Sequence, residues 1–189
     1  MAYGTGMRSP VVLGKYELVE RLATGGMAEL FLATALGPAG VHKTVVIKRI
    51  RPEHTQDPRF VNLFINEARI GMMLTHPNVV QVYDLGRAQG TWYIAMEYVH
   101  GKDLMRVFRR LRAVGERLDP LIAVHLVAQL LRGLHHAHTR TSSDGRPLNL
   151  VHHDVSPHNV LVGFDGQVKL VDFGIARMQQ EGTPLPGES

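Results

Sequence analysis

Apolar residues in the first half of the chain recur mostly with the spacing of β-strands, in short alternating or β-branched runs. The glycine turn at 24–26 separates the first two runs, which is the arrangement of a hairpin. Between the third and fourth runs, residues 58–74 place apolar side chains at steps of three and four, which predicts one amphipathic helix. We therefore expect a five-stranded antiparallel sheet with one helix, the strands covering residues 16–22, 29–33, 44–50, 79–85 and 92–97.

The second half of the chain changes to a helical pattern after Gly101. Asp119 and Pro120 supply an N-cap and a first helical residue for a helix that reaches about His138. A polar loop follows, and two β-branched runs around a further glycine turn then predict a hairpin at 160–162 and 168–170. Strands and helices gathered in separate parts of the chain indicate the α+β class.

One charged residue lies within the apolar stripe of the helix predicted at 58–74. At helical spacing, Glu67 shares its face with Phe60, Phe64, Gly71 and Leu74. A buried carboxylate costs several kcal/mol unless a cation is close. Alternation along the strand at 44–50 places Lys48 on one face with Val46 and leaves the other face to Val45, Ile47 and Arg49. Lys48 is therefore the cation that we expect beside Glu67.

The composition of the 189 residues is that of a globular protein, with 44% hydrophobic and 20% charged residues. The absence of cysteine excludes disulfides and thiolate metal sites and favours a reducing compartment. No apolar run approaches the ~20 residues of a membrane helix, and the N-terminus has no apolar core of the signal-peptide type. We expect a cytoplasmic protein without a membrane span.

The formal net charge of +4 raises the question of a nucleic-acid partner. The densest basic cluster has no interleaved aromatic residues and no known reading motif, which favours a solvated helix face; it consists of Arg106, Arg109, Arg110 and Arg112. Histidines gather at 135, 136 and 138, without a carboxylate or cysteine that would complete a metal site. We therefore expect neither a nucleic-acid partner nor a histidine metal site.

A set of acidic and amide residues around the predicted hairpin carries the candidate chemistry. Asp154 and Asn159 precede the hairpin, and Asp172-Phe173-Gly174 follows it. Phosphoryl transfer requires a carboxylate to orient the attacking hydroxyl, which Asp154 can supply, and oxygen ligands for magnesium, which Asn159 and Asp172 can supply. The order D-x-x-x-x-N…D-F-G resembles that of the eukaryotic-type protein kinases. The resemblance implies phosphoryl transfer from Mg-ATP to a serine or threonine hydroxyl of a protein.

Two further segments resemble kinase motifs that bind phosphates. Residues 23–30 resemble the glycine-rich loop G-x-G-x-x-G-x-V, with Ala23 and Ala28 in place of the first and third glycines. The run that ends in Lys48 resembles V-A-I-K, which implies that Lys48 holds the α- and β-phosphates while it pairs with Glu67. Alanine leaves the loop backbone less free than glycine does, so we expect nucleotide affinity to be weakened at most.

The resemblance also assigns a hinge and the remaining site residues. Residues 96–99 resemble the segment between the two lobes of a kinase, whose backbone meets the edge of adenine and whose methionine guards the back of the pocket. The implied catalytic residues are Asp154, Lys48 and Glu67, and the implied magnesium ligands are Asn159 and Asp172. The implied nucleotide contacts are Leu22, Gly25, Gly26, Leu30, Val46, Lys48, Glu97, Val99 and Leu161.

Two residues depart from the family's catalytic-loop pattern, H-R-D-L-K-x-x-N. His153 replaces an arginine that would bind a phosphate on the activation loop, so we expect no switching through that contact. Ser156 replaces a lysine near the transferring phosphate, which should slow the chemistry. The amino-acid sequence at 25–27, 64–69 and 145–149 resembles that of the bacterial serine/threonine kinases, particularly the myxobacterial type.

These motifs predict four segments, namely a flexible lead at 1–14, a kinase N-lobe at 15–97, a partial C-lobe at 98–177 and a disordered tail at 178–189. No A-P-E motif follows Gly174, so we expect a truncated C-lobe with uncovered apolar surface on the 119–138 helix. Three interpretations stay open: a minimal kinase completed by self-association or by a partner, a nucleotide-binding pseudokinase or interaction module, and an inactive remnant. The sequence does not indicate which protein is the substrate.

Overall fold

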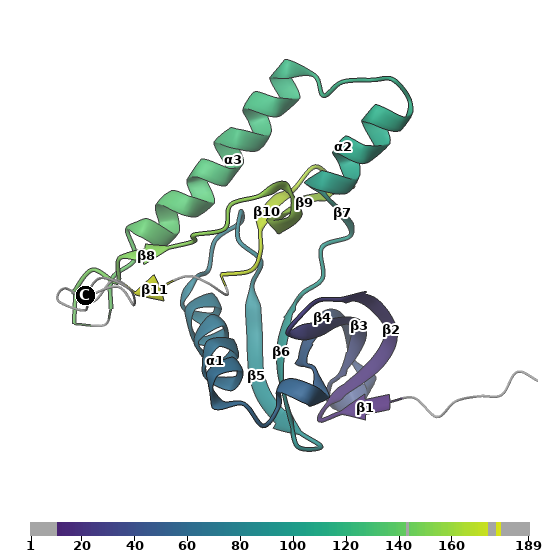
Figure 1. Ribbon diagram of the computed structural model, residues 1–189, viewed down its shortest axis with the longest axis vertical. Coiled ribbons are helices and arrows are strands. Elements are labelled where there is room, and N and C mark those ends of the chain that lie inside the picture. The colour runs from purple at the N-terminus through teal and green to yellow at the C-terminus, as the bar shows by residue number, and fades with distance from the viewer. Residues whose placement is uncertain (1–10, 143, 174–176, 179–189) are drawn as a thin grey trace, which may run out of the picture. The chain divides into compact units, whose positions relative to one another are not determined.

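Figure 1 shows the computed structural model of the chain, which describes residues 11–142, 144–173 and 177–178. Residues 1–10 of the predicted lead, residues 179–189 of the predicted tail and Gly174 of the D-F-G motif lie outside the described residues. The chain packs as two compact units. The first consists of residues up to 61 together with 83–98, and the second of 62–82 together with the residues from 99 on.

The first unit is built on a six-stranded sheet with the strand order β1-β2-β3-β4-β6-β5. Each of the first three strands pairs antiparallel with the next, and β4 pairs antiparallel with β6. This confirms the predicted α+β class. The strands are β1 (Val11–Leu13), β2 (Tyr16–Thr24), β3 (Ala28–Leu36), β4 (His42–Ile50), β5 (Val82–Ala88) and β6 (Thr91–Glu97).

The expected number of five strands is wrong, because β1 adds a sixth. The sequence predicts a lead up to residue 14, since a run of three residues is too short to show a periodic pattern. Gly14 turns the chain with a φ of 62°, and Leu13 pairs with Tyr16 across this turn. The Leu13 side chain is fully buried, and its burial in the core holds this short edge strand in place.

β5 also begins later than predicted, at Val82 instead of near residue 79. The two preceding valines belong to the second unit. Val79 forms a parallel bridge with Leu170, and the Val80 N–H donates to the Leu170 carbonyl at 2.9 Å. An apolar run that looks continuous in the sequence is therefore divided between two sheets, because its two parts pair with different strands.

One face of the six-stranded sheet carries the core of the first unit. Val45 and Ile47 of β4 lie in this core, whereas Val46 and Lys48 are half-buried on the opposite face, as the alternation predicts. β4 therefore presents Lys48 on the face away from this core. The core consists of Leu13, Tyr16, Ala33, Val45, Ile47, Tyr93 and Ala95.

The predicted helix is α1 (Pro58–Met73). The Arg59 N–H donates to Oδ1 of Asp57 at 2.9 Å, so Asp57 caps the helix and Pro58 occupies the first helical position. Most of α1 belongs to the second unit, where Ile70 lies in the core, although we expected the whole helix within the N-lobe. Its buried residues are Phe64, Glu67, Ala68, Ile70 and Gly71.

The second unit contains two further helices and two small sheets (Figure 1). Asp119 caps the long helix by accepting from the Leu121 N–H at 2.7 Å, which confirms the predicted start. The predicted hairpin is also confirmed, whereas β7, β8 and β11 were not predicted. None of the described helices is both long and apolar enough to cross a membrane. The elements are β7 (Gly101–Asp103), α2 (Leu104–Ala113), α3 (Pro120–His138), β8 (Leu150–Val151), β9 (Val160–Gly163), β10 (Val168–Leu170) and β11 (Arg177–Met178).

Asn78 fixes β10, the strand that leads to Asp172. Its Nδ2 donates to the Val168 carbonyl at 2.9 Å, and its backbone carbonyl accepts from the Leu170 N–H at 2.9 Å. α3 approaches Asn78 so closely that a Cβ on Gly133 would lie 2.8 Å from the Asn78 carbonyl oxygen. The position of β10 therefore depends on a buried asparagine and on a glycine in the long helix.

α3 presents an apolar stripe to solvent. Its four members recur at helical spacing and are 53–81% exposed; they are Leu121, Val124, Val127 and Leu131. The uncovered apolar surface that we expected on this helix is therefore present.

We predict that the purified chain self-associates through the apolar stripe, because burying apolar area stabilises a complex by ~25 cal/mol per Å². Replacing Val124 and Leu131 together by glutamate should lower the mass measured by light scattering, with little effect on the unfolding midpoint. Arg132→Glu on the same helix is the control and should leave the mass unchanged. A wild-type chain that stays monomeric at every concentration would contradict the prediction.

Candidate active site

His152 is buried at the start of the predicted catalytic loop, with 1% exposure. The Asp154 N–H donates to Nδ1 of His152 at 3.2 Å, and Nε2 lies 3.2 Å from the Val171 carbonyl oxygen. An N–H can only donate and a carbonyl can only accept, so the neutral tautomer protonated on Nε2 satisfies both contacts. The Phe173 ring packs on the imidazole, with centroids 4.5 Å apart. His152 thus connects the segment before Asp154 to the segment before Asp172.

Burial favours the neutral form of this histidine. It lowers the pKa of His152, and the loop carbonyl and nearby carboxylates oppose the effect only in part. His76 and His136, also in the second unit, stack with ring centroids 5.0 Å apart, and burial lowers the pKa of each. Three neutral histidines therefore belong to the folded structure of this unit near neutral pH.

The turn after Asp154 brings Asn159 back to it. Pro157 begins the short helix η3 (Pro157–Asn159), and the Asn159 N–H donates to the Ser156 carbonyl at 2.9 Å. The Asn159 Nδ2 then donates to the Asp154 carbonyl at 3.0 Å and to its Oδ2 at 2.8 Å. Because Nδ2 and Oδ1 are bonded to the same planar carbon, the Asn159 Oδ1 points away from these two acceptors.

One more bond closes a hydrogen-bonded ring through His152, Asp154, Asn159 and Val171. The Val171 N–H donates to the Asn159 carbonyl at 2.9 Å. This bond holds the residue after Val171, which is Asp172, close to Asn159. His153 and Asp172 have φ values of 63° and 70°. Left-handed backbone costs roughly 1–2 kcal/mol in residues other than glycine, and such strain gathers at functional sites.

In the first unit, strand register places the predicted lysine on a largely apolar face. Leu30 lies directly opposite Lys48 in the β3–β4 pair, and Ile94 lies opposite Lys48 in the β4–β6 pair. Paired residues point to the same face of a sheet, and Val46 shares that face by alternation. Three of the residues predicted to contact a nucleotide, Leu30, Val46 and Lys48, therefore line one surface.

The predicted glycine-rich loop is the turn between β2 and β3. The Gly25 N–H donates to the Ala28 carbonyl at 2.9 Å, and Leu22 lies where the β2–β3 register shifts. A Cβ on Gly26 would meet nothing within 4 Å, so packing within the chain does not require this glycine. An open backbone is what the approach of a phosphate requires.

The remaining predicted residues are divided between the units. Glu67 is buried on α1, 9% exposed, in the second unit; because Lys48 belongs to the first unit, their pairing stays a prediction. Glu97 ends β6, and the buried Val99 follows it. Leu161 is half-buried on β9, the central strand between β10 and β7.

Comparison with known proteins agrees with these features. The chain matches the protein kinase domain family over residues 16–186. It is 45% identical over 166 residues to tyrosine-protein kinase MasK of Myxococcus xanthus, covering 88% of this chain and 26% of that protein. It is 34% identical over 165 residues to serine/threonine-protein kinase PrkC of Bacillus subtilis, covering 87% of this chain and 23% of that protein.

A solved structure extends the agreement to three dimensions. The kinase domain of PknI from Mycobacterium tuberculosis superposes with a TM-score of 0.70 at 28% identity, over 89% of this chain and 62% of that chain. This chain belongs to the protein kinase family, and the resemblance to bacterial kinases predicted from its motifs is confirmed. The chain spans about a quarter of the length of the two relatives named above.

Three residues that hold predicted site residues within their own units escaped the sequence-based prediction. His152 connects the two acidic segments, and Arg51 and His54 bind the glycine-rich turn through hydrogen bonds to Gly25 and Gly26. The motif H-x-D marks His152, but nothing in the sequence shows that its ring is buried. Neither Arg51 nor His54 belongs to a motif, and their partners are backbone carbonyls, which carry no sequence signal.

We predict that the free energy of unfolding decreases as the pH falls below about 6.5, the pKa of histidine in an unfolded chain. The folded state holds His76, His136 and His152 with lowered pKa values, so the unfolded chain binds more protons and acid favours it. Urea unfolding from about pH 8 down to about pH 5 measures the slope.

His152→Asn should make this slope shallower by up to ~1.4 kcal/mol per pH unit, the effect of one proton. His125→Asn replaces an exposed histidine of α3 and is the control. An unchanged slope in a folded His152→Asn protein would show that His152 is not held neutral.

Proposed function

We propose that this chain binds Mg-ATP and transfers its γ-phosphoryl group to a serine or threonine hydroxyl of a protein. The observation that carries the proposal is the hydrogen-bonded ring, in which the Asn159 amide holds the Asp154 carboxylate at 2.8 Å. A carboxylate fixed in this way can orient a hydroxyl and accept its proton. Membership of the protein kinase family supports the same chemistry.

The donor set fits magnesium, which prefers oxygen ligands such as carboxylates and amide carbonyls. Asn159 donates from its Nδ2 to Asp154, so its Oδ1 points away from Asp154, and the carboxylate of Asp172 belongs to an exposed residue. We assign Asn159 and Asp172 as the magnesium ligands. Bound magnesium supplies positive charge that neutralises the transferring phosphoryl group.

The family resemblance assigns nucleotide contacts to residues of both units. In the first unit, Lys48 would bind the α- and β-phosphates, and the face formed with Leu30 and Val46 offers apolar surface to the base. Gly25 and Gly26 would cover the phosphates with their backbone, and Leu22 borders the same turn. Glu97, Val99 and Leu161 are assigned to the base by the family resemblance. Glu67 would keep Lys48 in place through an ion pair.

The catalytic step itself requires little covalent chemistry from the protein. Asp154 accepts a hydrogen bond from the substrate hydroxyl and takes its proton as the new oxygen–phosphorus bond forms. The bond between the γ-phosphorus and the oxygen of the β-phosphate breaks in the same transfer, and ADP leaves. Asn159 keeps the carboxylate in one orientation, and His152 keeps the backbone of the loop in place. Lys48 holds the phosphates in position, so the reacting oxygen meets the phosphorus in line.

One departure from the family pattern favours a second candidate function. Ser156 stands where a lysine would place a positive charge near the transferring phosphate. Loss of that charge weakens stabilisation of the transition state more than it weakens binding of the ground state. A nucleotide-binding pseudokinase that binds Mg-ATP without transfer is therefore the alternative that the same experiment must distinguish.

We predict that the chain transfers label from γ-labelled Mg-ATP to a generic basic protein. Asp154→Ala and Lys48→Met should each reduce the rate at least ~100-fold, because they remove the base and the phosphate contact. Lys102→Met, an exposed lysine on β7, is the matched control and should keep the wild-type rate. Undiminished transfer by folded Lys48→Met protein would refute the assignment.

Two further readouts separate the alternatives. Magnesium-dependent thermal stabilisation by ATP without transfer, lost in Asp172→Ala, would identify the pseudokinase. Phosphoamino-acid analysis of the labelled protein should show phosphoserine or phosphothreonine. Phosphotyrosine alone would overturn the serine/threonine assignment and would agree instead with the name of the relative, tyrosine-protein kinase MasK.

A further inference from the structure

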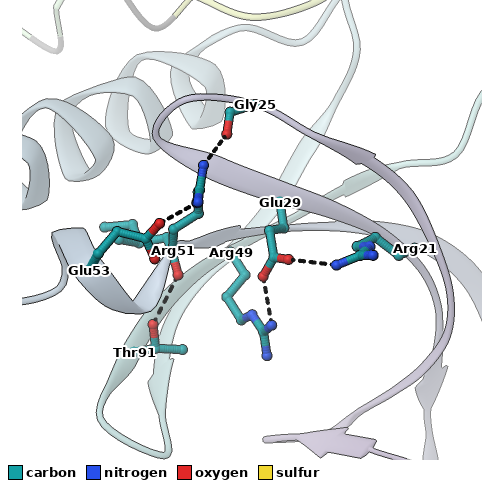
Figure 2. A network of polar contacts seen from close by, with 8 residues as sticks. Arg21, Gly25, Glu29, Arg49, Arg51, Glu53 and Thr91 are labelled. Carbon is teal, nitrogen blue, oxygen red and sulfur yellow. Dashed lines mark hydrogen bonds and ion pairs between the residues drawn. The ribbon is translucent and has the colours of Figure 1, made fainter.

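The turn between β2 and β3 is held from outside by one short segment of the first unit. The Arg51 Nη1 donates to the Gly25 carbonyl at 3.2 Å, as Figure 2 shows, and the His54 Nε2 lies 3.0 Å from the Gly26 carbonyl. The Arg51 backbone N–H donates to the Met27 carbonyl at 3.0 Å. Three successive carbonyls of the turn are thus bound to residues 51–54.

The local structure of this segment explains why both side chains reach the turn. Pro52 begins the 3₁₀ helix η2 (Pro52–His54), and Arg51 is its N-cap. Arg51 directly precedes this single helical turn and His54 ends it, so both side chains lie close enough to reach the turn between β2 and β3. Glu53 pairs with Arg51 (Figure 2), and the Phe60 ring lies 4.3 Å from the His54 ring, centroid to centroid.

These bonds also determine where the amide groups of the turn point. In a trans peptide the C=O and the following N–H point in opposite directions, and the described residues contain no cis peptide bond. The Gly25 and Gly26 carbonyls face Arg51 and His54, so the N–H groups of Gly26 and Met27 face the other way. Two successive N–H groups that share a direction form a place for an anion.

The turn has little else to keep it in this conformation. Residues 21–26 are all exposed, and a Cβ on Gly26 would meet nothing within 4 Å. Within the turn, one backbone bond joins the Gly25 N–H to the Ala28 carbonyl. The hydrogen bonds from Arg51 and His54 are therefore a large share of what selects the conformation of a glycine-containing turn, which would otherwise be free to move.

We infer that Arg51 and His54 are positioning residues for the nucleotide-binding turn, because they turn the Gly26 and Met27 N–H groups toward the nucleotide phosphates. This inference rests on the proposed Mg-ATP function. Neither residue touches a reacting atom; each acts through the backbone carbonyl that it binds. Arg51 brings a positive charge to a carbonyl, which strengthens its hydrogen bond.

The test compares Arg51→Ala and His54→Ala with the wild type in two assays. Each variant should raise the KM for ATP roughly three- to ten-fold, the effect of one lost hydrogen bond, while kcat changes less than two-fold. Amide hydrogen exchange of the nucleotide-free protein should become faster in the peptide that covers residues 24–28. Arg51→Lys keeps a charged donor and should recover part of the loss in both assays.

Arg59→Ala is the matched control, because Arg59 pairs with Asp57 and is 86% exposed. It should change neither the KM nor the exchange at residues 24–28. Unchanged KM and unchanged exchange in Arg51→Ala would overturn the inference, as would an equal loss in Arg59→Ala. A wild type that binds no nucleotide would refute the proposed function alone, because faster exchange in Arg51→Ala would still show that Arg51 holds the turn.

Discussion

The buried imidazole of His152 is the contact on which the arrangement of the acidic residues depends. Its two nitrogens meet an N–H from one segment and a carbonyl from another, at 3.2 Å each. Burial lowers its pKa and keeps it neutral, so one ring can accept on one side and donate on the other. Asn159 completes the ring of hydrogen bonds, because it binds Asp154 through its side chain and Val171 through its carbonyl. These bonds fix the positions of Asp154 and of Asp172, the residue after Val171.

In the first unit, the exposed turn between β2 and β3 is held in a defined conformation. The sheet supplies a rigid support, with Val45 and Ile47 in its core and Lys48 on the opposite face. The turn itself receives hydrogen bonds from Arg51 and His54. The loss of two glycines from the family's loop pattern and the addition of these bonds act in the same direction, because both reduce the freedom of the backbone.

Much of the fold followed from local signals. Asp57-Pro58 and Asp119-Pro120 mark helix starts because an acidic cap and a following proline act through adjacent residues. The hairpin of β9 and β10 was likewise predictable from a turn between two apolar runs. β1, β7, β8 and β11 were missed because strands of two or three residues are defined by their partners, and no periodic pattern fits in so short a segment.

The sequence by itself determined the family of this protein, because the order and spacing of Lys48, Asp154, Asn159 and Asp172 mark the protein kinase family without any coordinates. It also determined which face of β4 carries the lysine, since alternation is a property of the strand alone. Only the tertiary structure decided that His152 connects the two acidic segments and that Arg51 and His54 bind the glycine turn. These contacts are made to backbone carbonyls and amides, which every residue possesses, and most of them join residues far apart in sequence. No pattern of side chains could therefore reveal them.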